Sequence, residues 1–316
     1  MTRLSTLSVL ALLVLSAGCS GSGGSSGTAP MAASTAPAAT APGTGTTTPP
    51  ATPVSTNPNV GVTVPRNPIV FVHGIEFVGQ FVGGERHFIG VPQDLRSQGA
   101  TVLRPTLPGL QSIDTRARAL KDAIETAFPD PAVKLNLVAH SMGGLDARYM
   151  ITHLGMGPRV LSLTTISTPH QGTPISDAAL GILPGNAQRA LDSVMNLVGW
   201  DMDFVINTSE DYVQNTFNPS TPDDPAVFYQ SWAGKADPFG LNGGYRCRAL
   251  LLVQWGIVAG YRGDNDGLIP VQSAQYGLWR GELAADHMAE SGIDPKSFDH
   301  QAFYRDVAQD LAQRGF

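Results

Sequence analysis

The sequence has no excess of positive charge and almost no cysteine. Its formal net charge is −6, and charged residues make up 15% of the 316 residues, so nothing in it suggests a nucleic acid as a partner. Only Cys19 and Cys247 are present, and no intrachain disulfide can form if Cys19 is lipidated or removed. Apolar residues make up an ordinary 42%, which is enough for a chain of this length to bury a full core.

The N-terminus lacks a hydrophobic run long enough to cross a membrane. The apolar run 7–15 within MTRLSTLSVLALLVLSAGCS is far shorter than the ~20 residues of a membrane-spanning helix. Arg3 before it and small residues after it are typical of a secretory signal peptide, which we assign to residues 1–19. The end of this segment, Leu15-Ser16-Ala17-Gly18-Cys19, resembles the lipobox of bacterial lipoproteins, whose cysteine becomes the lipidated first residue. The resemblance implies a lipid anchor on Cys19 at the bacterial cell envelope (outer membrane or surface). Ordinary cleavage, giving a secreted protein, is the alternative.

Residues 20–60 consist almost entirely of Gly, Ser, Thr, Ala and Pro. Such a composition cannot bury enough apolar surface to offset the entropy lost on ordering. We therefore predict a disordered tether, which would hold a folded domain away from a membrane surface. The remaining residues, 61–316, contain no internal repeat and have the size of one α/β domain.

Short buried strands alternate with helices along this domain. Strands are predicted at 67–74, 101–103, 133–140 and 159–167, and helices at 112–128, 144–154 and 302–315, with a further helix-like stretch that stops at Gly99. This alternation favours the α/β class, with a mainly parallel central sheet and helices on both faces. Ligands of such sheets bind at the carboxyl ends of the strands. The groups that follow the strands are therefore candidate site residues: His73-Gly74-Ile75, His140-Ser141-Met142 and Thr168-Pro169-His170.

Ser141 lies in a pattern suited to a serine nucleophile. A sharp strand-to-helix turn exposes the hydroxyl and tolerates only small residues two positions to either side. Here these positions are Ala139 and Gly143. A serine that merely caps a helix before two glycines is the alternative. The buried strand before Ser141 and the helix after it favour the nucleophile.

An acyl-transfer site also needs amide donors aimed at the developing oxyanion. The backbone N–H of Met142, directly after the candidate nucleophile, is one such donor. The second is predicted at Ile75, because Gly74 permits a tight turn after the first strand. A simple strand terminator at His73-Gly74 is the alternative.

The acid should follow the serine along the chain. Asp264 and Asp266 lie in the turn-rich segment YRGDNDGLIP, after the apolar stretch 248–260, where a carboxylate that follows a strand is expected. Asp266 is the candidate for the acid, because it lies beside Gly267 and ahead of an apolar pair. We interpret Asp264 as a charged loop residue that faces solvent. The DNDG segment could bind calcium, but it lacks the ligand spacing and terminal glutamate of an EF-hand.

The base should be a histidine that follows the acid. His287 and His300 both precede the last predicted helix. The residues alone do not choose between them.

Taken together, the segments of this domain resemble a known family. IVFVHGIEF, HFIGVPQDLRSQGATVLRP, VKLNLVAHSMGGLDARYMITHL, LTTISTPHQGTPISDAAL, FYQSWAG and NDGLIPVQSAQYG resemble, in that order, the true lipases of the Pseudomonas and Burkholderia type. These are α/β-hydrolases that act on triacylglycerols and other fatty-acid esters. The likeness covers most of residues 67–314. It implies the α/β-hydrolase fold and a water-insoluble lipid ester as substrate.

The resemblance also bears on the base. In these lipases the catalytic histidine lies in an Asn-His-Leu-Asp-Glu segment, which Asp286-His287-Met288-Ala289-Glu290 matches. The resemblance implies His287 as the base and places His300, the alternative, in the loop before the last helix. The family aspartate that binds calcium falls on Ala289, so no metal or other cofactor is expected. Cys247 has no partner for the family disulfide. Some other interaction must then hold the His287 loop.

Residues 175–226 interrupt the strand–helix alternation. Apolar residues recur at helical spacing there, among them Leu191, Val194, Met195, Val198, Phe204 and Val205. In the resembling family this insertion carries a movable lid over the serine. A cap packed permanently on the domain is the alternative.

These features predict a serine hydrolase that cleaves carboxylic esters of lipids through an acyl-enzyme. A short-chain esterase or a polyester (polyhydroxyalkanoate) depolymerase would use the same residues. A surface lipoprotein that has lost catalysis and merely binds lipid is a further alternative. The complete set of Ser141, Asp266 and His287 argues against it.

Overall fold

The computed structural model describes residues 62–75, 87–183, 187, 202–238, 245–247, 249–293 and 298–316. The predicted signal peptide, the lipidation of Cys19 and the tether lie outside these residues, and so do residues 184–186 and 188–201 of the predicted insertion, which include Leu191, Val194, Met195 and Val198. In the part of the chain that is described, no helix is both long and apolar enough to span a bilayer.

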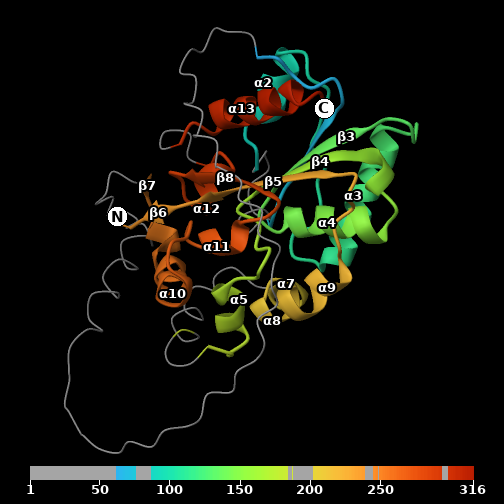
Figure 1. Cartoon of the computed structure of the whole chain (residues 1–316). Coiled ribbons are helices and arrows are strands. Elements are labelled where there is room, and N and C mark those ends of the chain that lie inside the picture. Colours follow the sequence, from blue (N-terminus) through green and yellow to red (C-terminus); the bar gives the residue numbers. More distant parts are fainter. Residues whose placement is uncertain are drawn as a thin grey trace, which may run out of the picture. The chain divides into compact units, whose positions relative to one another are not determined.

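A six-stranded parallel sheet forms the centre of the domain (Figure 1). The strand order is β2-β1-β3-β4-β5-β8, and every neighbouring pair runs parallel. The strands are β1 (Ile69–Val72), β2 (Val102–Leu103), β3 (Leu135–His140), β4 (Val160–Ile166), β5 (Phe228–Gly234) and β8 (Leu278–Leu283). Two short strands, β6 (Ala236–Asp237) and β7 (Tyr245–Arg246), pair separately. The predicted α/β class with a parallel central sheet is confirmed.

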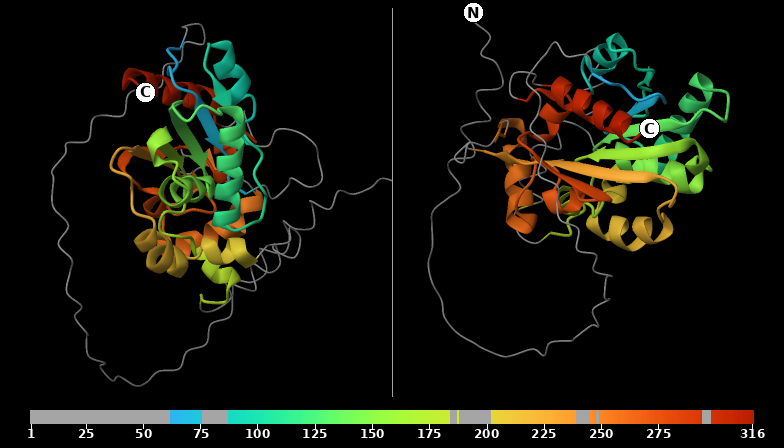
Figure 2. Two further views of the ribbon diagram at one scale, coloured as in Figure 1. Left: turned by 90° about the vertical axis from the view of Figure 1, so that its right-hand side faces the viewer. Right: turned by 45° about the horizontal axis from the view of Figure 1, so that its top comes forward.

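Helices cover both faces of this sheet (Figures 1 and 2). On one face, α2 (Val91–Ser97) and α13 (His300–Gln313) pack together against β1 and β3. On the other face lie α3 (Ile113–Ala127) and α4 (Gly143–His153). This cover explains why β1 and β3 are buried along their whole lengths. The remaining elements between β3 and α13, outside the insertion, are η1 (Gly157–Arg159), η3 (Ala249–Leu251), α10 (Leu252–Arg262), α11 (Val271–Ala274) and α12 (His287–Glu290).

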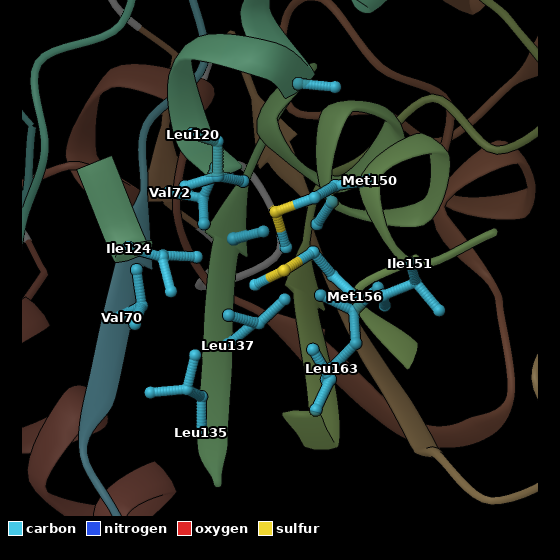
Figure 3. Packing of buried hydrophobic residues seen from close by; sticks show 14 of the residues in the cluster. Val70, Val72, Leu120, Ile124, Leu135, Leu137, Met150, Ile151, Met156 and Leu163 are labelled. Carbon is cyan, nitrogen blue, oxygen red and sulfur yellow. The ribbon is translucent and has the colours of Figure 1, made fainter. Parts of the chain in front are cut away.

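The core beneath α3 and α4 fixes the strand that leads to Ser141. Figure 3 shows Leu135 and Leu137 of β3 packed between β1 and β4, with side chains of both helices above them. On α3, Leu120 and Ile124 reach this core because they recur at helical spacing. The helix begins after Ser112, whose Oγ accepts a hydrogen bond from the N–H of Thr115.

The apolar stretch 248–260 does not form the strand that was expected before the acid. Residues 249–251 form the 3-10 helix η3 and residues 252–262 form α10. Gln254, Ile257 and Val258 are buried while Leu252 is 40% exposed, which is the one-sided burial of a surface helix. In the central sheet, the strand that precedes this stretch along the chain is β5.

The described part of the predicted insertion is helical. It comprises α5 (Pro174–Ala179), α7 (Met202–Asn207), α8 (Glu210–Tyr212), the π-helix η2 (Val213–Phe217) and α9 (Asn218–Ser220). Phe204 and Val205 are buried in one apolar cluster with Ile75 and Met142. Arg148 of α4 holds the C-terminal part of the insertion against the domain, because it donates to the side chain of Asn218 and to the backbone oxygen of Thr221. Movement of a lid stays a prediction.

Candidate active site

Ser141 lies in a strained turn between β3 and α4. Its φ angle is 57°, in the left-handed region that residues other than glycine rarely adopt. The N–H of Ser141 donates to the oxygen of Ile166 at 2.9 Å, and its backbone oxygen accepts from Oγ1 of Thr168 at 2.7 Å. Strand β4 and the residues after it therefore hold the turn in place.

Small residues surround this turn because backbone segments meet there. A Cβ at Gly74 would lie 2.5 Å from Cβ of Ser141, and a Cβ at Gly143 would lie 2.5 Å from the oxygen of Val72. A side chain at Gly144 would collide with Thr168. Gly74, Gly143 and Gly144 are thus required by the close approach of the Ser141 turn to the ends of β1 and β4.

The structure brings Ser141, His287 and Asp266 together. Nε2 of His287 lies 2.9 Å from Oγ of Ser141, and Nδ1 of the same ring lies 2.7 Å from Oδ2 of Asp266. The carboxylate is fully buried, and its Oδ1 accepts from the backbone N–H groups of Leu268 (2.8 Å) and Ile269 (2.7 Å). These contacts hold the histidine between a hydroxyl and a carboxylate, the geometry of a serine hydrolase triad.

The other two candidates lie elsewhere. Nε2 of His300 contacts the backbone oxygen of Ile89 at 2.7 Å, so this ring ties α13 to the start of α2. Asp264 is 62% exposed at its side chain and pairs with Lys235 at 2.6 Å. The structure brings neither residue into contact with Ser141.

The third group of post-strand residues, Thr168-Pro169-His170, supports the site from outside the contacts between Ser141, His287 and Asp266. Thr168 donates to the nucleophile turn. His170 stacks on Tyr276, with ring centroids 4.0 Å apart and planes at 12°. Burial, followed by the nearby charge of Arg148, lowers the pKa of His170 well below its ordinary value. His170 therefore packs as an uncharged ring between β4 and the residues that follow α11.

A cavity opens in front of Ser141 and His287. Ile75 and Met142, whose amides were predicted to bind the oxyanion, line it with these two residues. Met142 precedes the first residue of α4, where N–H groups are without helical partners and favour negative charge. The rest of the wall is mainly apolar and is formed by Pro169, Ile175, Phe204, Leu268 and Ile269, with the hydroxyl-bearing Thr173, Ser176 and Thr208. We call residues 73–75 the oxyanion loop, after the role that the sequence predicts for the amide of Ile75.

Comparison with known proteins shows the family to which the chain belongs. A model of the Alpha/beta hydrolase family matches residues 69–312, which include Ser141, Asp266 and His287. The chain belongs to this family.

The curated relatives of this hydrolase include lipases. It is 32% identical over 258 residues to triacylglycerol lipase 2 of Saccharomyces cerevisiae, an alignment that covers 73% of this chain and 74% of that protein. It is 32% identical over 155 residues to the triacylglycerol lipase of Burkholderia plantarii, covering 46% of this chain and 42% of that one. The chain therefore spans less than half the length of the Burkholderia enzyme.

Solved structures resemble the hydrolase at the level of fold. A metagenomic carboxyl esterase has a TM-score of 0.64 at 17% identity, covering 82% of this chain and 80% of that one. The mature lipase of Bacillus licheniformis has a TM-score of 0.57 at 21% identity, covering 78% of this chain and 93% of that one. At these identities the likeness shows the fold alone, which is the predicted α/β-hydrolase fold.

The hydrolase holds its oxyanion loop with Arg116, a residue that sequence reasoning missed. The guanidinium is completely buried and its Nε lies 2.8 Å from Oδ2 of Asp146 on α4. Its Nη2 donates to the backbone oxygens of His73 (2.8 Å) and Gly74 (3.2 Å). Its Nη1 donates to the backbone oxygens at positions 108 and 109. Arg116 thus fixes the peptide units of His73 and Gly74. The peptide unit that contains the oxygen of Gly74 also contains the N–H of Ile75.

The sequence did contain a signal for this role. Arg116 is the charged residue on the apolar face of α3, between Ile113 and Leu120 at helical spacing. A charge on a buried stripe must find a partner. The partner, Asp146, cannot be found by helical periodicity, because it lies on another helix. Burial raises the pKa of Asp146 to about 6, and the charge of Arg116 opposes this rise.

We expect Arg116→Lys to lower kcat about 10-fold with little change in KM. Lysine keeps a positive charge beside Asp146 but cannot reach all the backbone oxygens at once, so the oxyanion loop loosens. Oxyanion contacts stabilise the transition state rather than the bound substrate. Steady-state kinetics on a p-nitrophenyl ester measures this split. Arg118→Lys is the matched control, since Arg118 is 61% exposed on the same helix. Equal effects of the two substitutions would contradict the role of Arg116.

Proposed function

We propose that the chain cleaves carboxylic esters of lipids in two steps through an acyl-enzyme on Ser141. At the level of reaction class it is a carboxylic ester hydrolase, because the relative that aligns with most of its length is a triacylglycerol lipase. The observation that carries the assignment of residues is the 2.9 Å contact of Ser141 Oγ with Nε2 of His287, whose Nδ1 is held by buried Asp266.

In the first step Ser141 Oγ attacks the ester carbonyl carbon and its proton passes to Nε2 of His287. The carbonyl oxygen becomes an oxyanion, which the N–H groups of Ile75 and Met142 are placed to stabilise. Asp266 holds Nδ1–H of the base and stabilises the imidazolium. When the tetrahedral intermediate collapses, the C–O bond to the alcohol breaks and His287 returns its proton to the departing oxygen.

The second step releases the acid. Water attacks the carbonyl carbon of the acyl-enzyme, and His287 takes a proton from it. The oxyanion forms again at the same amides. The bond to Ser141 Oγ then breaks, Oγ recovers its proton from His287, and the carboxylic acid leaves the cavity.

The apolar wall of the cavity supports a fatty acyl chain as the group bound beside Ser141. Ile175, Phe204 and Leu268 offer no charge to the substrate, and such surfaces bind hydrocarbon. We infer an emulsified triacylglycerol as the preferred substrate, in the manner of the Pseudomonas and Burkholderia lipases that the sequence resembles. Higher rates on soluble short-chain esters or on polyhydroxyalkanoate would instead assign a short-chain esterase or a depolymerase.

The location of the protein is proposed on sequence alone. We propose that residues 1–19 direct export, that Cys19 carries a lipid anchor, and that residues 20–60 tether the hydrolase domain to the bacterial envelope. The support is the apolar run, the lipobox-like end and the composition that follows it. Fractionation tests the anchor, because Cys19→Ala should move the protein from the membrane fraction to the soluble one.

A fluorophosphonate probe tests the nucleophile directly. We expect it to form one covalent adduct with the folded protein, which mass spectrometry of a digest should map to the peptide that contains Ser141. Ser141→Ala should remain unlabelled. A folded wild-type protein that does not react would support the alternative of an inactive lipid-binding lipoprotein.

A further inference from the structure

Behind the proposed triad lies a buried carboxyl group that the mechanism does not use. Glu290 ends α12, the short helix that begins at His287, and it is 0% exposed. Its Oε2 lies 3.0 Å from Nε2 of His140, the residue directly before Ser141. Its Oε1 accepts a hydrogen bond from Oγ of Ser167 at 2.8 Å. The carboxyl therefore joins the segment that bears the base to the ends of β3 and β4.

The surroundings of Glu290 are shaped to hold this carboxyl. Ser167 has a φ of 46°, a strained conformation of the kind that gathers at functional sites. Its Oγ accepts from the N–H of Gly234 at 2.9 Å while it donates to Glu290. A side chain at Gly234 would collide with Oε1 of Glu290. On the far side, the hydroxyl of Tyr304 donates to the backbone oxygen of Glu290 at 3.1 Å.

The pKa shifts of Glu290 and His140 favour the uncharged form of each group. Burial, and then the negative charge of Asp266, raises the pKa of Glu290 well above its ordinary value. Burial, and then the nearby His287 and His87, lowers the pKa of His140 well below its ordinary value. Both shifts favour a hydrogen bond between an uncharged carboxyl group and an uncharged imidazole over an ion pair.

The residues of this loop do not fit the calcium ion that the lipase resemblance implies. The family ligand position is Ala289, which is fully buried and has no side-chain oxygen. Calcium takes 6–8 oxygen ligands. Within the described ranges, the one group of His, Cys, Asp or Glu side chains close enough to share an ion is His140, His287 and Glu290. Two imidazoles in this group suit calcium poorly, and we derive no step through this ion.

We propose that Glu290 is a positioning residue, whose buried carboxyl fixes the His287 segment (residues 285–290) against the nucleophile strand in place of a metal ion. This inference rests on the proposed function, because it names what positions the base of that same site. Within the segment, Asp286 caps α12. The ring and the backbone N–H of His287 both contact Asp266. Glu290 supplies separate contacts to the ends of β3 and β4.

Removal of the carboxyl tests this tie through the split between kcat and KM. We expect Glu290→Ala to lower kcat about 30-fold with KM changed less than about 2-fold, because a displacement of reacting groups by ~1 Å costs roughly 100-fold in rate. We expect this substitution to leave the cavity in front of Ser141 unchanged. Glu290→Gln should recover most of the loss, since its amide donates to His140 and accepts from Ser167. Glu125→Ala, at a glutamate that is 49% exposed on α3, is the matched control.

The pH dependence of stability gives a readout that needs no activity. The pKa of Glu290 is raised in the folded chain above its unfolded value of 4.5. Its contribution to the free energy of unfolding is therefore fully present below pH 4.5 and is lost as the pH rises through the folded-state value. Glu290→Gln does not titrate, so thermal unfolding should show the wild type losing stability relative to this variant as the pH rises. The titratable groups that face Glu290 are common to both proteins: His140, His287, Asp266, Asp286 and Tyr304.

Three results would overturn the inference. The first is a Glu290→Ala protein whose kcat stays within about 2-fold of the wild type. The second, which also decides the matter if that variant does not fold, is a stability difference between the wild type and Glu290→Gln that does not change with pH. The third is a wild type that EDTA inactivates and calcium restores. A wild type that neither hydrolyses esters nor reacts with the fluorophosphonate contradicts the proposed function instead. The pH dependence of the stability difference between the wild type and Glu290→Gln still tests the role of Glu290 in that case.

Discussion

Replacing His287 by alanine is expected to lower kcat/KM for p-nitrophenyl esters by about 10⁵- to 10⁶-fold, with thermal unfolding close to that of the wild type. The imidazole nitrogen 2.9 Å from Ser141 Oγ is the group placed to take the proton of the hydroxyl. Without it the serine attacks as a neutral alcohol. The amides of Ile75 and Met142 and the cavity remain, so a residual rate above that of water is expected.

His300→Ala is the control for this experiment, because both histidines follow the acid along the chain and the residues alone did not choose between them. His300 contacts the backbone oxygen of Ile89, so its removal should cost about 1 kcal/mol of unfolding free energy and leave kcat/KM within about 3-fold. The reverse pattern, with activity lost in His300→Ala and kept in His287→Ala, would reassign the base.

The nucleophile turn could be predicted because its signals are local. Strand β3, Ser141 and helix α4 follow one another within 135–153. The spacing of apolar residues indicates the strand and the helix, and the small residues around Ser141 indicate the turn. The glycines at 74 and 143 were also visible as small residues. The collision that a Cβ would cause at each of them is the physical reason for the pattern.

The side chains that position the site could not be predicted, because their partners are distant in the sequence. The contacts of Glu290 with Ser167 and His140 span 123 and 150 residues. Arg116 reaches the oxyanion loop across 42 and 43 residues. Periodicity reports which face of an element is buried, and it carries no information about which buried charges meet. The family resemblance placed the calcium-binding position at Ala289, which has no ligand atom in its side chain, so another interaction was expected to hold the His287 segment.

The acid-bearing region was interpreted wrongly for a related reason. The stretch 248–260 is apolar in most positions, and short apolar runs do not distinguish a buried strand from a helix. Its length favours a helix, since strands usually have 5–6 residues. Asp266 nevertheless lies in a loop, as predicted, with Gly263 and Gly267 in turns on both sides, and it contacts His287.

Asp266→Asn should lower kcat by about 10⁴-fold with the fold intact, because it leaves His287 in the wrong tautomer. Oδ1 of Asp266 accepts two backbone N–H groups, those of Leu268 and Ile269. The amide oxygen of asparagine must take this place, since an NH₂ group there would face two donors. The NH₂ group is then forced toward Nδ1 of His287. Nδ1 becomes an acceptor, the ring proton moves to Nε2, and the base can no longer receive the proton of Ser141.

Asp264→Asn is the matched control for the loop. It makes the same chemical change two residues earlier, at an exposed carboxylate that pairs with Lys235, where an ion pair contributes at most about 1 kcal/mol. We expect its kcat to stay within about 2-fold of the wild type. Comparable losses in both variants would mean that the loop tolerates no amide for structural reasons. Only a large loss at 266 with none at 264 ties the effect to the orientation of the His287 ring.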